Sequence, residues 1–285
     1  MNLILDSGAY SAWTKKIDIN IEEYKDFIME YIDVFDYVVN LDRIPGEYGR
    51  MGTEEERETS AAIGYQNYWY LISNGVPKQK LIHVFHQDER MFWLERMIQE
   101  MEYIGIAPSK DRNTIQKREW LDKCMKVACR SDGYPKIKFH AFGVTSIELL
   151  RKYPWYSADS SSWMAFSKYG AVLIPRTDGR YYDYTRTPYT IFLSIKSPKR
   201  LMEGRHFDSL SPMQQEKVIE YIERKKFILG SSTTDENGKE VIIEEGLRNN
   251  GILRDQINMM FYIDFAKSIP PWPWRYKFNG QQGLF

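Results

Sequence analysis

Short apolar segments that alternate with helical segments place the strongest constraint on how this chain can fold. The apolar segments have the length of buried strands and fall near residues 3–5, 37–41, 81–85, 103–107, 137–142 and 155–158. Between most of them, apolar residues recur at helical spacing. Strands that alternate with helices favour a parallel sheet, because each parallel connection needs a crossover. Six such units, with residues 171–174 as a candidate seventh strand, favour a barrel over a doubly wound open sheet.

The length and hydrophobic content fit one large core. The chain has 285 residues, of which 43% are hydrophobic, and α/β barrels of about 250 residues commonly form one domain. We predict an α/β fold of the TIM (β/α)8-barrel type, abbreviated or irregular, with a C-terminal helical extension. Residues 1–180 are expected to form the barrel core with its catalytic strand ends. Residues 181–285 are expected to complete the barrel and to add a basic, aromatic segment and C-terminal helices, within a single domain overall.

Sequence signals also mark the ends of several helices. A polar helix is predicted over residues 54–73, closed by Asn74-Gly75. Another helix begins at Ser211-Pro212, because serine is a favourable N-cap and proline suits the first helical position. Residues 230–240 are predicted to be a polar turn region, and a last helix is predicted from about residue 244 to residue 267.

The balance of charge excludes some classes of function. Lys and Arg total 39, as do Asp and Glu, so a globally basic nucleic-acid binder is excluded, while a local basic patch is not. No apolar run approaches the length of about 20 residues that spans a membrane. The N-terminus lacks the features of a signal peptide. We therefore expect a cytoplasmic protein with no membrane partner.

The cysteines and histidines do not form a recognisable metal motif. Cys124 and Cys129 are the two cysteines, they do not make a Cys-x-x-Cys pair, and the four histidines lack zinc-finger spacing. We expect two free thiols on one helix rather than a disulfide or a partial metal site. No metal site and no cofactor are therefore predicted.

The ends of the predicted strands carry the residues that suggest chemistry. In parallel α/β barrels, reactive groups lie at the C-terminal ends of the strands. In chain order, these ends carry Asp6, Asp42, His86 with Gln87, Gly105 and Asp159. One aspartate at such a position is more often a helix N-cap. Three aspartates that converge on one mouth favour an active site.

Paired carboxylates at one mouth suit glycosyl transfer. One carboxylate attacks or stabilises an oxocarbenium-like centre, and the second moves a proton on or off the leaving group. A third aspartate, together with an amide side chain and a backbone N–H, can hydrogen-bond the edge of a purine. The spacing alone does not separate such an enzyme from a sugar hydrolase.

Several of these strand ends resemble motifs of the tRNA-guanine transglycosylases. Residues 6–10, Asp-Ser-Gly-Ala-Tyr, resemble the family's Asp-Ser-Gly-Gly-Phe/Tyr motif. Residues 35–42 look like the strand that delivers the family's base-recognising aspartate. Residues 84–87, Val-Phe-His-Gln, are similar to its Gln-Gln-Gly strand end, and residues 104–107 are similar to its Gly-Gly-Leu-Ala segment.

The resemblance continues in the same order along the chain. Residues 142–150 resemble the family's Gly-Val-Gly-x-Pro-Glu-Asp-Leu-Leu stretch, and Asp159 falls where the family keeps its nucleophilic aspartate. Residues 174–180 faintly resemble its Leu-Pro-Thr-Arg-x-Gly-Arg motif. Each match is short, but together they cover residues 3 to about 180.

The resemblance implies a role for most of these positions. Asp159 would attack C1′ and form a covalent glycosyl-enzyme, and Asp6 would act as general acid/base on the departing guanine and the incoming base. Asp42 would bind the N1/N2 edge of the base, while Gln87 and the backbone N–H of Gly105 would meet its O6 side. The complete set of expected base-binding residues is Asp42, Gln87, Gly105, Ser7, Gly8, His86 and His140.

Two members of that set are expected for other reasons. Gly8 would let the backbone approach the ligand closely. His140 lies near the end of its predicted strand, where it is either a pocket residue or a hydrogen-bonded structural histidine. His86 stands where the family has Gln, and Ala9 stands where it has a second Gly.

The departures from the family bear on the substrate. Its zinc-binding Cys/His cluster, which helps to hold tRNA, has no counterpart here, and its first two barrel strands must be missing, replaced or supplied after residue 170. A short, zinc-free chain is similar to the phage transglycosylases that insert 7-deazaguanine bases into DNA. This similarity implies exchange of guanine for a base such as preQ0 in DNA, in a host cytoplasm, which would protect a genome from restriction enzymes. DNA is thus the expected partner ahead of tRNA, a free 7-deazaguanine base is the expected small-molecule substrate, and the target guanine must be flipped out.

A basic, tyrosine-rich segment over residues 174–205 is the candidate DNA-binding surface. Its expected contacts are Arg176, Arg180, Arg186, Lys199 and Arg200. A solvated face with ordinary packing tyrosines explains the same pattern equally well. Three alternative functions stay open from the sequence: guanine exchange in tRNA, an N-glycoside hydrolase on a related TIM barrel, and a catalytically inactive barrel that only binds.

Overall fold

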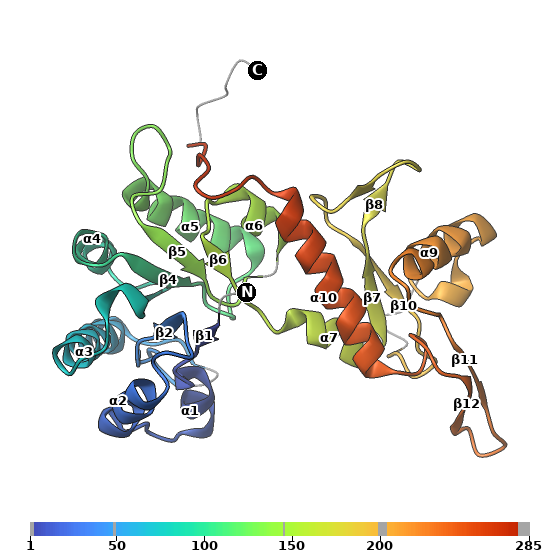
Figure 1. Ribbon diagram of the computed structural model, residues 1–285, viewed down its shortest axis with the longest axis horizontal. Coiled ribbons are helices and arrows are strands. Elements are labelled where there is room, and N and C mark those ends of the chain that lie inside the picture. The colour runs from blue at the N-terminus through green and yellow to red at the C-terminus, as the bar shows by residue number, and fades with distance from the viewer. Residues whose placement is uncertain (1–2, 48–49, 145, 199–203, 279–285) are drawn as a thin grey trace. The chain divides into compact units, whose positions relative to one another are not determined.

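The computed structural model describes residues 3–47, 50–144, 146–198 and 204–278, and these residues form two compact units (Figure 1). The first unit contains residues 3–144, 152–159 and 271–278. The second contains residues 146–151 and 160–270. The first unit thus contains most of the described residues before 160, and the second contains most of those from 160 to 270.

The first unit is built on a six-stranded parallel sheet that curls into half of a barrel. Its neighbouring strands follow one another in chain order: β1 (Ile4–Leu5), β2 (Tyr37–Val39), β3 (Leu81–His86), β4 (Tyr103–Ala107), β5 (Lys138–Ala141) and β6 (Ser157–Ala158). This order agrees with the predicted strands and with an α/β fold. A doubly wound sheet would instead reverse its strand order at a switch point.

The register of the sheet aligns functional positions across the strands. Val84 pairs with Gly105, Gly105 with His140, and His140 with Ser157. Because paired residues of parallel strands point to the same face, these side chains form one row. The polar members of the row lie at β5 and β6, close to the C-terminal end of the sheet.

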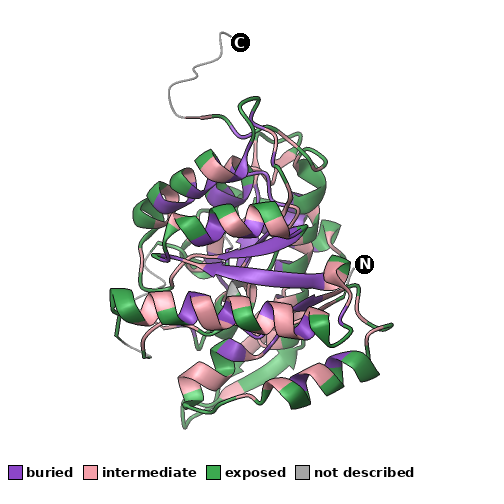
Figure 2. Ribbon diagram, turned by 90° about the vertical axis from the view of Figure 1, so that its left-hand side faces the viewer, coloured by how far each residue is buried: buried purple, intermediate pink, exposed green. Residues whose placement is uncertain are grey.

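The helices of the first unit bury one side against the sheet. They are α1 (Ala9–Lys15), α2 (Ile21–Glu30), α3 (Glu54–Ser73), α4 (Met91–Glu100) and α5 (Thr114–Ala128), with the short 3-10 helix η1 (Lys78–Lys80) before β3. Figure 2 shows buried strands behind helices whose turns alternate between buried and exposed residues. The predicted helix over residues 54–73 is confirmed, and a capping box between Thr53 and Glu56 begins it. Helix α6 (Ile147–Lys152), most of which belongs to the second unit, precedes β6 in the chain.

The second unit has its own core. Its elements are α7 (Ser162–Lys168), β7 (Ala171–Ile174), β8 (Arg176–Thr177), β9 (Tyr182–Asp183), β10 (Tyr189–Phe192), η2 (Phe207–Ser209), α9 (Pro212–Arg224), β11 (Ser231–Thr234), β12 (Glu240–Glu244) and α10 (Gly251–Ser268). Buried side chains of β7, β10, α9 and α10 pack together, among them Val172, Ile191, Ile222 and Ile257. The predicted helix after Ser211-Pro212 is confirmed, with Ser211 as its N-cap.

The candidate seventh strand forms but does not extend the parallel sheet. β7 pairs antiparallel with β10, with Ala171 opposite Phe192 and Ile174 opposite Tyr189. A strand whose pairing side is taken by an antiparallel neighbour cannot add to a parallel ladder on that side. The described residues therefore show a half-barrel and separate two-stranded sheets rather than a closed eight-stranded barrel.

Two local predictions in the second unit are wrong. Residues 230–240, predicted as a turn region, contain strand β11, which pairs antiparallel with β12. The last helix begins at Gly251 rather than near residue 244, because the Asn250 side chain accepts hydrogen bonds from the backbone N–H groups of Ile252 and Leu253. Strand β12 ends at Glu244, and residues 245–250 form a turn before the helix. None of the described helices is both long and apolar enough to cross a membrane.

Candidate active site

Asp6 and Asp159 follow the two edge strands of the half-barrel, yet their charges interact. Asp6 follows β1 and Asp159 follows β6, at opposite ends of the strand order. Burial raises the pKa of Asp6, and the negative charges of Asp42 and then Asp159 raise it further, against the backbone N–H of Ser7 and the charge of His140. The residue as a whole is exposed, but the surrounding protein removes part of the water from its carboxyl group. The charges of Asp6 and Asp159 therefore act on each other, although the two residues follow opposite edge strands.

Asp159 has the opposite electrostatic environment. Burial alone would raise its pKa, but a hydrogen bond and the charge of His140, together with the backbone N–H of Gly143, lower the pKa below its ordinary value. His140 Nε2 lies 3.2 Å from Asp159 Oδ1, and the Gly143 N–H donates to the same oxygen at 3.1 Å. The Asp159 side chain remains 59% exposed. It is therefore an accessible, ionised carboxylate.

His140 is held from its other side by a hydroxyl chain. Its Nδ1 lies 2.5 Å from Ser157 Oγ, which also hydrogen-bonds the hydroxyl of Tyr103. The His140 side chain is only 3% exposed. The sequence left open whether His140 lines the pocket or is structural. Its ring nitrogens contact Asp159 and Ser157, so it positions the Asp159 carboxylate.

The third predicted aspartate, Asp42, lies in a buried charged group. His86 Nε2 lies 2.8 Å from Asp42 Oδ2, and His86 Nδ1 lies 3.2 Å from Glu89 Oε1. Ser7 Oγ donates to Asp42 Oδ1 at 3.3 Å. Burial opposes a charge on His86, but its hydrogen bonds to both carboxylates prevail and raise its pKa to about 10. Glu89 is missing from the residues predicted from sequence, although its place three positions after His86 was available as a signal.

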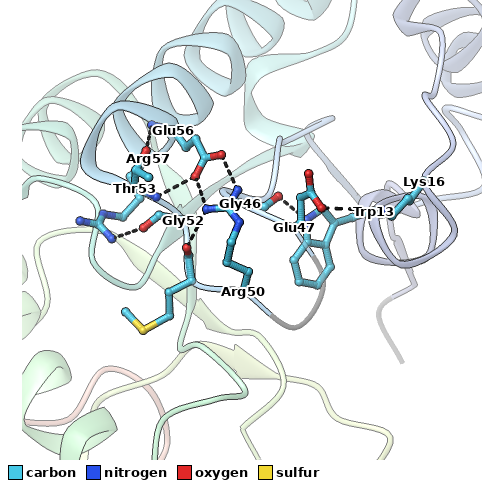
Figure 3. Close-up of polar contacts among 10 residues, drawn as sticks. Trp13, Lys16, Gly46, Glu47, Arg50, Gly52, Thr53, Glu56 and Arg57 are labelled. Carbon is cyan, nitrogen blue, oxygen red and sulfur yellow. Dashed lines mark hydrogen bonds and ion pairs between the residues drawn. The ribbon is translucent and has the colours of Figure 1, made fainter.

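The segment that carries Ser7 and Gly8 is fastened to the loop after Asp42. Gly8 has φ of 75°, in the left-handed region that favours glycine, and begins α1. Within α1, the indole N–H of Trp13 donates to the carbonyl of Gly46 at 2.8 Å. Figure 3 shows this contact beside the ion pair of Arg50 with Glu56. The Trp13 bond links the helix after β1 to the loop after β2, and the Arg50–Glu56 ion pair joins that loop to the first turn of α3.

Two predicted base contacts are already engaged with the protein. The Gln87 side-chain oxygen accepts a hydrogen bond from the Ser109 backbone N–H at 2.9 Å. Gly105 lies in the middle of β4, and the ring of Phe142 occupies the space beside its Cα, where a Cβ would come within 2.0 Å of a ring carbon. The absence of a side chain at Gly105 is thus explained by Phe142.

The residues predicted to bind nucleic acid lie in the second unit or outside the described residues. The guanidinium of Arg176 lies 3.7 Å from the ring centroid of Tyr189, and its Nε donates to the carbonyl of Thr187. Arg180 lines a surface hollow of about 440 Å³ that also contains Glu216, Glu220 and Glu223. Arg186 is exposed. Lys199 and Arg200 lie outside the described residues.

The cysteines lie away from these charged groups. Cys124 and Cys129 are buried free thiols, within α5 and at its C-terminal cap. Within the described ranges, no cluster of three or more His, Cys, Asp or Glu side chains is arranged to hold a metal ion.

Comparisons of the chain with protein-family models, with curated proteins and with solved structures find no match.

Proposed function

We propose that this protein is a transglycosylase that exchanges guanine for a 7-deazaguanine base, such as preQ0, in DNA. The observation that carries the proposal is the opposite perturbation of two carboxyl groups whose charges interact. The pKa of Asp6 is raised and that of Asp159 is lowered. Environments that separate two carboxyl pKa values assign one group to proton transfer and the other to attack as an anion.

The proposed reaction has two displacements at the sugar C1′. In the first, a carboxylate oxygen of Asp159 bonds to C1′, the bond from C1′ to guanine breaks, and Asp6 supplies the proton that guanine takes up. In the second, Asp6 removes a proton from the ring nitrogen of the incoming base. That nitrogen then bonds to C1′ and displaces Asp159. Two inversions give net retention of configuration.

The neighbouring residues support these roles. His140 and the Gly143 N–H stabilise the Asp159 anion before attack and accept it again when it leaves. The Asp42 carboxylate, held by Ser7 and His86, is an acceptor for adjacent N–H groups on the edge of a guanine-type base. We include in the proposal that the six strands derive from an abbreviated (β/α)8-type barrel, whose reactive groups lie at the C-terminal strand ends.

The choice of DNA rests on the sequence resemblance and on the basic segment. Arg176 stacked on Tyr189 offers a cation and a ring for phosphate and base contacts. An N-glycoside hydrolase is the second candidate, because the exposed Asp159 side chain leaves room for water to resolve a glycosyl-enzyme.

The test is an exchange assay with radiolabelled guanine on DNA and on tRNA, followed by nucleoside analysis with preQ0 present. We expect label to enter DNA with the wild-type protein and with D18N, which alters an exposed aspartate, but not with D159N or D6N. If radiolabel entered tRNA but not DNA, the substrate would be tRNA and the proposal of DNA would be refuted. Abasic sites without incorporation would establish the hydrolase, and full exchange by D159N would refute the assigned nucleophile.

A further inference from the structure

The most unusual charged group in the first unit is a histidine enclosed by two carboxylates. The side chains of Glu89, Asp42 and His86 are 2%, 9% and 12% exposed. Burial of two unpaired carboxylates is costly, whereas a protonated imidazole between them removes one net negative charge. Both ring nitrogens of His86 face a carboxylate oxygen, which is the arrangement that suits two N–H donors.

The turn after β3 is shaped to bring Glu89 back to His86. Asp88 has φ of 75°, a conformation uncommon outside glycine, and its carboxylate pairs with Arg112 at 2.7 Å. Glu89 Oε2 accepts the His86 backbone N–H at 3.1 Å, while Oε1 faces the imidazole. Glu89 therefore contacts both the backbone and the ring of the residue that holds Asp42.

The other titratable groups near Asp42 do not supply a positive charge that could compensate its carboxylate. Burial lowers the pKa of His83 to about 3 despite the opposing charge of Asp42, so His83 is neutral. The side-chain amide of Asn40 lies 3.0 Å from His83 Nδ1. Tyr24 donates its hydroxyl to the carbonyl of Val39, and Asp6 is a further carboxyl group whose charge interacts with that of Asp42. A cation at His86 is the nearest compensation for the charge of Asp42.

We infer that Glu89 is a positioning residue: it holds His86 as an imidazolium, and that cation keeps Asp42 an oriented carboxylate for an incoming purine-type base. The inference about base recognition rests on the proposed function, whereas the charge on His86 does not. Glu89 does not touch the substrate and acts through His86. The matching sequence pattern is a histidine at a strand end with glutamate three residues later.

The variant E89Q removes the negative charge of Glu89 but keeps the size of its side chain. A glutamine amide at this position can donate to Nδ1 of a neutral His86, which still donates from Nε2 to Asp42, so both hydrogen bonds persist. The matched control is E95Q, which removes a glutamate charge from an exposed position on α4. Thermal unfolding of both variants checks that they fold.

The first measurement is NMR titration of the free protein labelled at its four histidines, with H86Q used to assign the His86 signal. We expect His86 to be protonated at pH 8 in the wild type and in E95Q. In E89Q, its titration midpoint should fall by about 1–3 pH units, the effect of losing an adjacent opposite charge. A neutral His86 in the wild type at pH 7, or an unchanged midpoint in E89Q, would overturn the inference even if E89Q proved unstable in other assays.

The second measurement is the pH profile of kcat/KM for the free base in the exchange assay. In E89Q, His86 loses its proton at a lower pH than in the wild type. The alkaline limb of the profile should therefore move to lower pH in E89Q, by about 1 pH unit or more, and stay fixed in E95Q. If the profiles of the wild type and E89Q coincided, Glu89 would have no role in base recognition. If the wild type showed no exchange but the NMR result were as expected, the proposed function would be refuted. The inference that Glu89 holds His86 as a cation would still be supported.

Discussion

Replacing Gly105 with alanine tests whether Phe142 is the reason for glycine at this position. A Cβ at Gly105 would lie 2.0 Å from Phe142 Cε2 and 2.6 Å from Cδ2, whereas carbon atoms pack at about 3.5 Å or more. The ring must therefore retreat by about 1.5 Å. Overpacking of this kind costs about 1–3 kcal/mol.

The displaced ring should also disturb the candidate active site. Its centroid lies 4.3 Å from that of His140, which hydrogen-bonds Asp159. We expect G105A to lower the midpoint of urea unfolding and to reduce exchange activity together. In an F142A background the clash is absent, so the added cost of G105A should fall below about 0.5 kcal/mol in a double-mutant cycle. An equal cost in both backgrounds, or no cost in either, would refute the explanation.

Three further outcomes follow from other contacts. T53A removes the cap of α3 and should cost about 1 kcal/mol in urea unfolding, and an unchanged midpoint would contradict the capping role. The pKa of His83 is about 3 when folded and about 6.5 when unfolded, so its contribution to stability is present above pH 6.5 and is lost as the pH falls towards 3. The stability of the wild type should therefore fall more between pH 7 and pH 5 than that of H83Q, and parallel curves would count against a neutral buried histidine. If the basic segment binds DNA, R176A and R180A should each reduce the salt dependence of binding by about one unit of slope, whereas K123A on α5 should not.

Elements with local signals could be predicted from the sequence. The predicted helix over residues 54–73 matches α3, because the polar run begins after the Thr53 cap and ends at Asn74-Gly75. Strand β4 over residues 103–107 also matches its prediction, since a short apolar run between helices has few other conformations. The order of the six parallel strands followed from their alternation with helices.

Elements that depend on distant partners could not be predicted in the same way. Whether β7 joins the parallel sheet depends on β10, which lies later in the chain and pairs with it antiparallel. The apolar residues of β12 fit a helix as readily as a strand until pairing with β11 is known. Helix α10 starts after the Asn250 cap, whereas we predicted its start near residue 244.

Part of the candidate site could likewise be predicted from the sequence, and part could not. Strand-end positions identified Asp6, Asp42 and Asp159, because a parallel sheet places all its C-terminal ends together. The residues that interact with these aspartates could be identified only from the side-chain contacts in the structure. Glu89 reaches His86 through the turn at Asp88, whose positive φ could not be predicted from the sequence.

In the proposed mechanism, Asp159 becomes covalently bonded to the sugar during exchange. The most direct measurement is intact-protein mass spectrometry after incubation with a guanine-containing oligonucleotide, with peptide mapping of any adduct. We predict a denaturation-resistant adduct on Asp159 in the wild type, its loss on adding free base, and its absence in D159N. Base exchange without any adduct, or an adduct that persists in D159N, would contradict the proposed mechanism.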